Sequence, residues 1–210
     1  SKLGLNGQFG GIRRRVGFNA EFHWEKCKSN SLHYINKNIP LNTMKKLVIL
    51  SGAGISQESG ISTFRDANGL WENHDIMEVA SIQAWHKNPE LVLDFYNQRR
   101  RQLSEVKPNE AHKIIVQLED HFEVLIITQN VDDLHERAGS SKVLHLHGNI
   151  RYAKSSISNS IEKLYPIKDW ELRMTDLCDS GQSLRPHVVW FGEDVPMFDE
   201  AIKKAPEEEN

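Results

Sequence analysis

The feature that most constrains this 210-residue chain is a short apolar strand, residues 45–51, that leads into a loop of small residues. The loop contains Ser51, Gly52, Ala53, Gly54 and Ser56. Glycine lets a backbone turn tightly, and a small-residue loop before a helix presents N–H groups to a phosphate. The pattern predicts a dinucleotide pocket beside the first strand of a Rossmann-like sheet. An ordinary glycine-rich turn is the alternative, because the spacing is not G-x-G-x-x-G and the next glycine is Gly60.

Apolar runs and helix-start signals downstream predict an α/β fold. Residues 45–51 and 122–128 are continuous apolar stretches of the kind found in buried parallel strands, and residues 143–146 suit a shorter strand. Asn88-Pro89-Glu90 opens a helix that we expect to run from Pro89 to Glu105. A second helix follows Asn109, with an apolar face formed by Ala111, Ile114, Ile115 and Leu118. Together these elements predict a Rossmann-like parallel sheet with helices on both faces.

Three motifs, in order along the chain, narrow the function. The first continues the loop as ESGI at 58–61 and TFR at 63–65; the second is TQNVD at 128–132; the third is HLHG at 145–148. They resemble the sirtuin family motifs GAGIS with ESGI and TFR, TQN-x-D, and HG. The resemblance extends from Lys45 to about Ala201. It implies an NAD-dependent protein deacylase, similar to the bacterial class III desuccinylases and deacetylases.

The resemblance also implies which residues bind NAD: Gly52, Ala53, Gly54, Ile55, Ser56, Glu58, Phe64, Arg65, Gln129, Asn130 and Asp132. The last three follow an apolar strand, and ligands of open α/β sheets bind at that edge. Their amides and carboxylate suit ribose hydroxyls and the nicotinamide carboxamide. The alternative for the TQN motif is a turn that caps the next helix, a role that Asp133 suits better than Asp132. The alternatives for Phe64 and Arg65 are a core aromatic and a salt bridge.

His147 is the expected catalytic residue. A histidine titrates near neutral pH, so it can accept a hydroxyl proton. The resemblance implies that the acyl-lysine carbonyl oxygen attacks the ribose carbon that bears nicotinamide, and that His147 then activates a ribose hydroxyl. The products would be nicotinamide, free lysine and O-acyl-ADP-ribose. A histidine before a glycine can also be structural, and we expect a packing role for His145.

Tyr96 and Arg99 are expected to recognise the acyl group. They lie three residues apart on the predicted helix and so share a face. A phenol beside a guanidinium can hold a carboxylate, and the Y-x-x-R pattern resembles that of sirtuins that remove succinyl, malonyl or glutaryl groups. The alternative is a solvated face, because Arg99, Arg100 and Arg101 are consecutive.

A segment near the C-terminus is expected to bind the substrate peptide. Residues 188–193, VVWFGE, resemble the V-x-FGE segment of sirtuins. The matching positions are Val189, Phe191, Gly192 and Glu193. An extended peptide could add a strand to this edge and be recognised through its backbone. An ordinary strand and turn is the alternative.

Residues 150–184 correspond to the small domain of sirtuins, which often carries two CxxC pairs that bind structural zinc. This stretch has only Cys178, so we expect no metal site and no metal cofactor. We expect a small helical insertion without zinc instead. Its packing would depend on Leu164, Tyr165, Trp170, Leu172 and Leu177.

The two ends of the chain differ from this pattern. Residues 1–43 hold seven Lys or Arg against two Glu and show no clear periodicity; we expect an appended or poorly ordered basic segment, or else an extension that contacts a partner. Residues 44–149 would form the NAD-binding part, 150–184 the insertion, and 185–210 the substrate strand and a truncated end. Sirtuins continue with a strand that ends in GTS and an Asn-bearing strand. We therefore expect the C-terminal strands to be missing.

Bulk properties narrow the class of partner. A net charge of −3 does not favour nucleic-acid binding, and no apolar run reaches the ~18 residues of a membrane span. Two cysteines, Cys27 and Cys178, provide no disulfide framework, so a cytoplasmic location is expected. The expected partners are proteins with acylated lysines, and neither nucleic acid nor a membrane. The competing functions are ADP-ribosyl transfer, NAD hydrolysis, or NAD binding by a catalytically incompetent fragment.

Overall fold

A computed structural model describes residues 44–61, 70–71, 74–157 and 163–204, all within one compact unit, Pro40–Asn210. The expected basic segment at 1–43 and the acidic tail at 205–210 lie outside the described residues. Phe64 and Arg65 also lie outside them. The predictions for these positions therefore stay predictions.

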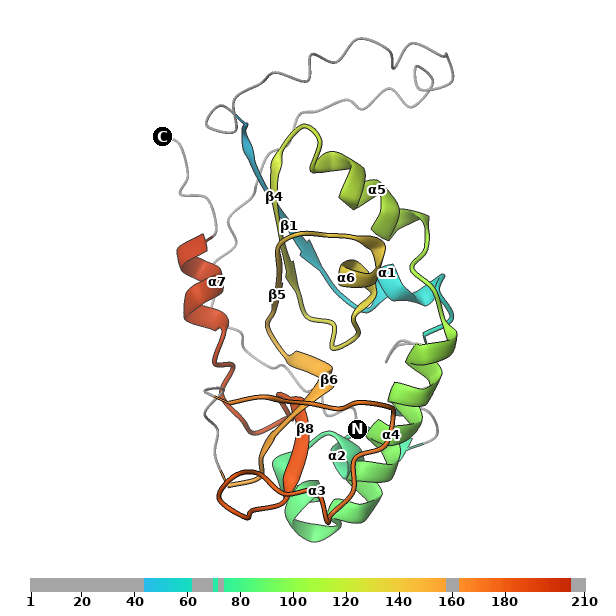
Figure 1. Ribbon diagram of the computed structural model, residues 1–210, viewed down its shortest axis with the longest axis vertical. Coiled ribbons are helices and arrows are strands. Elements are labelled where there is room, and N and C mark those ends of the chain that lie inside the picture. Colours follow the sequence, from blue (N-terminus) through green and yellow to red (C-terminus); the bar gives the residue numbers. More distant parts are fainter. Residues whose placement is uncertain (1–43, 62–69, 72–73, 158–162, 205–210) are drawn as a thin grey trace, which may run out of the picture. The chain divides into compact units, whose positions relative to one another are not determined.

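A three-stranded parallel sheet forms the centre of the NAD-binding part (Figure 1). It consists of β1 (Lys46–Ser51), β4 (Glu123–Thr128) and β5 (Val143–His145), in the order β1-β4-β5. Ser51 pairs with Thr128, and Thr128 pairs with His145, so the three strands end side by side. The predicted strands are confirmed, and the TQN and HLHG motifs start at the same edge of the sheet as the small-residue loop.

Helices cover both faces of this sheet, as expected (Figure 1). Side chains alternate along β4, so Val124 and Ile126 pack with α5 (Glu110–Leu118), whereas Ile127 packs with α7 (Phe198–Lys204). Two short helices, α1 (Gly54–Gln57) and α6 (Leu134–Ala138), begin a few residues after β1 and β4. Each therefore places its first turn at the carboxyl edge of the strands.

Two predictions of burial are wrong. The strand β1 was expected to be buried, but Leu50 is 68% exposed, because β1 pairs with β4 alone among the described strands. The helix α5 buries His112 and Ile115, whereas Ile114, expected on its apolar face, is 48% exposed. The side chain of Asn109 caps this helix by accepting hydrogen bonds from its first N–H groups.

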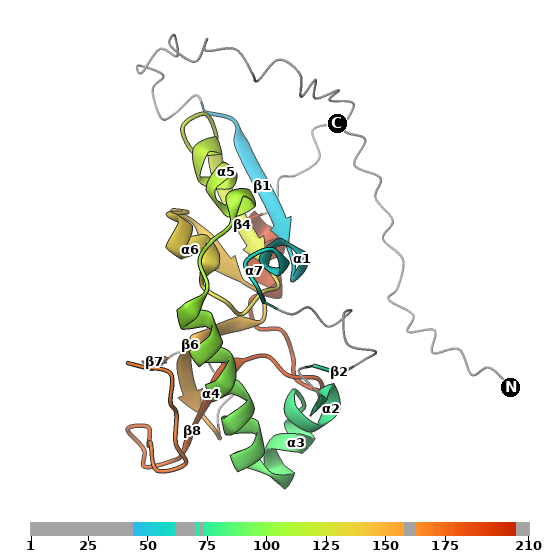
Figure 2. The ribbon, with the colours of Figure 1, turned by 90° about the vertical axis from the view of Figure 1, so that its right-hand side faces the viewer.

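The longest helix is α4 (Pro89–Glu105), and its bounds match the prediction. Asn88 caps it by accepting a 3.1 Å hydrogen bond from Leu91 N, and Pro89 fills its first turn. Two short helices, α2 (Ile76–Val79) and α3 (Ile82–Lys87), pack beside α4 (Figure 2). A two-stranded antiparallel ribbon, β2 (Leu70–Trp71) and β3 (His74–Asp75), precedes them.

The insertion is a β-structure rather than a helical one, so the predicted helical insertion is wrong. It forms an antiparallel sheet of β7 (Tyr165–Pro166), β6 (Gly148–Ser155) and β8 (Leu184–Val188), in that order. No helix lies between Gly148 and Val188 among the described residues. Of the expected packing residues, Leu172 is buried, but Trp170 and Leu177 are exposed.

Two side chains of α4 hold the insertion in place. Asn97 bonds both backbone groups of Leu172, donating to its carbonyl at 3.1 Å and accepting from its N–H at 2.9 Å. The buried guanidinium of Arg100 donates to Trp170 O at 2.7 Å. These bonds join residues about seventy positions apart, which a local pattern of the sequence does not reveal.

Within the described ranges, every helix is too short or too polar to cross a bilayer. The same residues contain no group of three or more His, Cys, Asp or Glu side chains that could hold a metal ion. Cys178 is buried and hydrogen-bonded to Ser180 and Ser155.

Candidate active site

Three predicted site residues from two motifs form one hydrogen-bonded cluster. Ser56 Oγ donates to Asp132 Oδ2 at 2.9 Å, and Asn130 Nδ2 donates to Ser56 Oγ at 3.1 Å. Ser56 and Asn130 are buried. The strand register places them together, because β1 and β4 end at paired residues. The cluster fixes polar side chains where the small-residue loop meets the TQN motif.

The small-residue loop has the form of a phosphate cradle. Its carbonyls at Gly52 and Ala53 accept from Ile55 N and Ser56 N, each at 3.1 Å, which closes the turn. Among the described residues, the N–H groups of Gly52, Ala53 and Gly54 donate to no acceptor. A Cβ added to Gly54 would meet nothing within 4 Å, so the loop has open space beside it. These observations fit a nucleotide phosphate.

Other predicted cofactor residues border this loop. A Cβ on Gly52 would lie 3.8 Å from Gln129 Oε1, so the Gln129 amide adjoins the loop. Ile55 is partly buried in the core beneath α5, and its carbonyl accepts from Asn109 Nδ2 at 2.7 Å. Glu58 is exposed at the end of α1. The loop is thus held by the core on the side of Ile55, and it has open space on the side of Gly54.

The prediction that Asp133 is the better cap for the following helix is wrong. Asp132 Oδ1 accepts from Leu134 N at 3.1 Å, whereas Asp133 makes no side-chain cap bond and pairs with Arg151 at 2.9 Å. Burial raises the pKa of Asp132, although hydrogen bonds from Leu134 and Ser56 oppose that rise. One carboxylate therefore both caps α6 and orders Ser56.

His147 lies in the turn between β5 and β6 and is partly exposed. Its Nδ1 is 3.0 Å from Gln129 O. A carbonyl oxygen only accepts, so Nδ1 of the neutral ring carries the hydrogen and Nε2 keeps its lone pair. This tautomer suits a general base. The bond also ties the imidazole to the residue that adjoins the small-residue loop.

His145 has a larger role than the packing role expected from the sequence. Its Nδ1 lies 2.8 Å from Asn130 O, and its Nε2 lies 2.6 Å from Glu136 Oε1. Burial alone would lower the pKa of His145, but the bond to Glu136 and its charge outweigh burial and raise that pKa. The available sequence signal was an acidic residue in the first turn of the helix after TQN, which can reach the end of the next strand.

The glycine of the HLHG motif is required by a close approach of two backbones. Gly148 has φ +83°, and a Cβ there would lie 2.2 Å from His187 O. Beside this close approach, Val189 N donates to His147 O at 2.9 Å. The turn that carries His147 is thus fitted directly against the end of β8.

A buried polar network lies beneath the site. Ser51 Oγ donates to Thr128 Oγ1 and also lies 2.9 Å from His135 Nε2, and Thr128 Oγ1 accepts from Asn130 N at 3.1 Å. Because Ser51 uses its only hydrogen on Thr128, His135 must donate from Nε2. His112 packs edge-on against His135, with ring centroids 4.9 Å apart. Burial first, and His112 second, lower the pKa of His135 to about 4.

Tyr96 and Arg99 lie on the inner side of α4. Tyr96 is fully buried and its hydroxyl accepts from Trp190 Nε1 at 2.9 Å; burial raises its pKa. Arg99 stacks over Phe95 at 5.5 Å and lines a hollow of about 50 Å³ together with Asp132. Of the three consecutive arginines, only Arg101 is exposed, so the solvated-face alternative fails for Arg99.

The predicted peptide-binding segment is already engaged with the protein. Phe191 bridges to the start of α3: its N–H donates to Ala80 O at 2.9 Å and its carbonyl accepts from Ile82 N at 3.2 Å. Gly192 turns with φ +89°. Glu193 pairs with the buried Arg185 and accepts from Trp190 N at 2.9 Å. The carboxylate of Glu193 stabilises the turn, whereas the Phe191 ring is 53% exposed.

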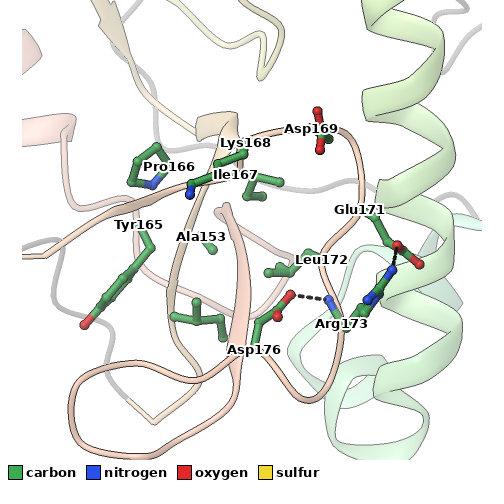
Figure 3. A pocket seen from close by; sticks show the side chains of 11 residues that line it. Ala153, Tyr165, Pro166, Ile167, Lys168, Asp169, Glu171, Leu172, Arg173 and Asp176 are labelled. Atoms are coloured by element: carbon green, nitrogen blue, oxygen red, sulfur yellow. Dashed lines mark hydrogen bonds and ion pairs between the residues drawn. The ribbon is translucent and has the colours of Figure 1, made fainter.

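A separate cavity of about 390 Å³ lies in the insertion and includes none of the predicted site residues (Figure 3). Its lining includes Ala153 and Leu172, and three of its charged lining residues interact with one another. Arg173 pairs with Glu171, and Asp176 accepts from Arg173 N at 2.8 Å. The cavity is therefore distinct from the cluster at the sheet edge.

Comparison with known proteins gives consistent matches. A sequence model described as Sir2 family matches residues 52–210. An NAD-dependent protein deacylase of Helicobacter pylori strain J99 is 62% identical over 161 residues, 76% of this chain and 67% of the relative. One of Bacteroides thetaiotaomicron is 50% identical over 164 residues, 76% and 70%.

Solved structures agree with these matches. A Sir2 homologue mutant in complex with ADP-ribose has a TM-score of 0.67 and 41% identity, over 77% of this chain and 66% of that one. A complex of a Sir2 homologue with NAD has a TM-score of 0.65 and 42% identity, over 77% and 64%. The chain thus spans about two thirds of the length of the proteins that it matches.

Proposed function

The chain belongs to the Sir2 family, and from this premise we propose that it removes acyl groups from protein lysines with consumption of NAD, giving nicotinamide and O-acyl-ADP-ribose. The predicted family, its α/β fold class, its enzyme class (NAD-dependent protein deacylase) and its cofactor (NAD) are confirmed by the matches. The observation that carries the proposal is the cluster of Ser56, Asn130 and Asp132 beside the Nδ1-protonated His147.

Each part of the site has a separate task in this proposal. When bound, NAD supplies a ribose carbon that accepts the acyl oxygen as nicotinamide leaves. The N–H groups of Gly52 to Gly54 would hold its phosphates. Ser56, Asn130 and Asp132 would orient its polar groups. His147 Nε2 would take the hydroxyl proton, because Nδ1 is fixed by Gln129 O.

The exposed parts of the predicted peptide-binding segment, residues 188–193, support a role in binding an acylated peptide. The Phe191 ring is available at the surface, and Val189 adjoins the carbonyl of His147. Gly192 exposes backbone, whereas Glu193 would contribute by holding the turn. We propose that acylated-lysine proteins bind here in an extended form.

A panel of acyl peptides incubated with NAD and analysed by mass spectrometry tests the proposal. O-acyl-ADP-ribose together with deacylated peptide is the expected result. Free ADP-ribose without dependence on peptide would favour NAD hydrolysis, and ADP-ribosylated protein would favour ADP-ribosyl transfer. NAD binding without any product would indicate a catalytically incompetent fragment.

We further propose that acidic acyl groups, succinyl and malonyl, are removed better than acetyl. The support is the position of Arg99, which belongs to α4 and lines a small hollow together with Asp132. Arg99→Met should lower kcat/KM for a succinyl peptide at least ~30-fold, the equivalent of ~2 kcal/mol for a lost partner of a buried charge. The loss for the acetyl peptide should be much smaller.

Arg101→Met is the matched control, because Arg101 is exposed and stacks on Trp170. This variant should leave both activities near the wild-type values. Equal losses on succinyl and acetyl peptides in Arg99→Met would refute the acyl preference. The cytoplasmic location stays a prediction.

A further inference from the structure

Both ring nitrogens of His145 face oxygen acceptors. Nδ1 lies 2.8 Å from the carbonyl oxygen of Asn130, and Nε2 lies 2.6 Å from the carboxylate of Glu136. A carbonyl carries no hydrogen, and a 2.6 Å contact between a carboxylate and a bare nitrogen would be repulsive. Each contact therefore contains a proton, whereas a neutral imidazole carries only one. The side chain is 12% exposed, which leaves little room for water to replace either partner.

These two bonds connect three elements at the edge of the sheet. His145 ends β5, Asn130 lies in the turn after β4, and Glu136 belongs to α6. The side chain of Asn130 continues to Ser56, which holds Asp132. Asn130 thus connects His145, through its carbonyl and its side chain, to the cluster that is proposed to contact NAD.

We propose that His145 is a positioning residue for NAD: as an imidazolium held between Asn130 and Glu136, it fixes the 130–132 turn in the geometry that receives the nucleotide. This inference rests on the proposed function for the identity of the ligand. His145 acts through Asn130. Its role is therefore distinct from that of His147, which is bonded to Gln129.

The charges around His145 favour the imidazolium. Glu136 and Asp132 both raise the pKa of His145. Two other histidines interact with it electrostatically, His135 of α6 and His187 of β8, and burial is the main cause that lowers the pKa of each to about 4. Both are thus neutral at pH 7 and do not repel a charged ring. The remaining neighbour, Asn149, is neutral, with Nδ2 3.4 Å from Nε2.

The first test observes the ring in the wild-type chain without NAD. A two-bond ¹H–¹⁵N NMR spectrum recorded across the pH range should show hydrogens on both nitrogens of His145 at pH 7. A His145 ring that is neutral at pH 7 would overturn the proposal. This result does not depend on deacylase activity.

The second test measures NAD binding by calorimetry on the full chain. His145→Gln retains at most one of the two bonds, and we expect its Kd for NAD to rise about tenfold, the equivalent of one charge-assisted hydrogen bond. Glu136→Gln removes the charge that favours the imidazolium. In that variant a neutral His145 can donate to the introduced amide or to Asn130 O, but not to both. As the pH is raised, the affinity of the variant for NAD should therefore fall at a lower pH than the affinity of the wild type does.

His121→Gln is the matched control and should bind NAD as the wild type does, because His121 is exposed. If both test variants bind NAD within about twofold of the wild type and keep its pH profile, His145 is structural only. If His145→Gln does not fold, Glu136→Gln and the wild-type spectrum still decide the question, because Glu136 is 38% exposed. If the wild type binds no NAD, the proposed function fails, while the spectrum still reports the state of the ring.

Discussion

Two pairs of histidines within the same sheet region have opposite surroundings. His112 of α5 and His135 of α6 pack edge-on against each other, and burial lowers the pKa of both. His145 and His147 lie at the end of β5, and their Nδ1 atoms face carbonyl oxygens. Burial keeps the first pair neutral, whereas the second pair is proposed to hold and transfer protons. The partners of a histidine, rather than its identity, decide which task it performs.

The largest effect is expected from a change in the second pair, His145 and His147. His147→Ala should lower kcat by about 10²–10⁴-fold, the usual contribution of a general base, while NAD still binds. Its resistance to acid unfolding should match that of the wild type, because His147 is partly exposed and outside the buried pair. Turnover close to the wild-type value would contradict the assignment. His121→Ala is the control, since its side chain is exposed.

The free energy of unfolding, measured as the pH is lowered, tests whether the first pair is held neutral in the folded chain. The pKa of His135 is about 4 in the folded chain and ~6.5 when unfolded, so the unfolded state binds the proton first as pH falls. The stabilisation is therefore complete above about pH 6.5 and is lost toward about pH 4. We expect protonation of His135 to account for ~3 kcal/mol of the free energy of unfolding that is lost over this pH range.

Urea unfolding at several pH values measures this effect. His135→Gln removes the titrating ring, so its free energy of unfolding should fall less steeply with acid than that of the wild type. Identical slopes for the two proteins would show that His135 is not held neutral. His121→Gln is the matched control and should retain the wild-type slope, because the side chain of His121 is exposed and outside the buried pair.

The smallest effect is expected at the hydroxyl that connects the buried pair to the site. Ser51→Ala removes the acceptor of His135 Nε2 and the donor to Thr128. Leaving a buried donor unsatisfied costs about 1–3 kcal/mol, which thermal or urea unfolding would detect. NAD affinity should change little, since Thr128 still accepts from Asn130 N. If Ser51→Ala lost more free energy of NAD binding than of unfolding, the buried pair His112 and His135 would also influence the site, which contradicts the contrast between the two pairs.

The sequence was most informative where structure depends on neighbouring residues. The strands at the sheet centre and the bounds of α4 follow from local apolar runs and from the Asn88-Pro89 start, and they were predicted closely. Ser56, Asn130 and Asp132 were each predicted to bind NAD, and they lie together in the structure because parallel strands that end together place their loops together.

Predictions failed where distant residues decide the outcome. The insertion is a β-sheet because β6 pairs with β7 and β8, and its loop is held by Asn97 of α4. Leu50 is exposed because β1 lies at the edge of the described sheet. The proposed role of His145 depends on Glu136, a residue of α6 whose carboxylate contacts His145 only in the folded chain. No local composition contains this information.

Gly148 couples the two halves of the proposed reaction centre mechanically. A side chain there would collide with the carbonyl of His187, so even alanine would push β8 outward and carry Val189 with it. The proposed general base, His147, and the segment proposed to receive the peptide are joined at this contact by the bond from Val189 N to His147 O. Their alignment is thus maintained by one missing methyl group, which makes position 148 a natural place to look for variants that fold yet misalign their substrates.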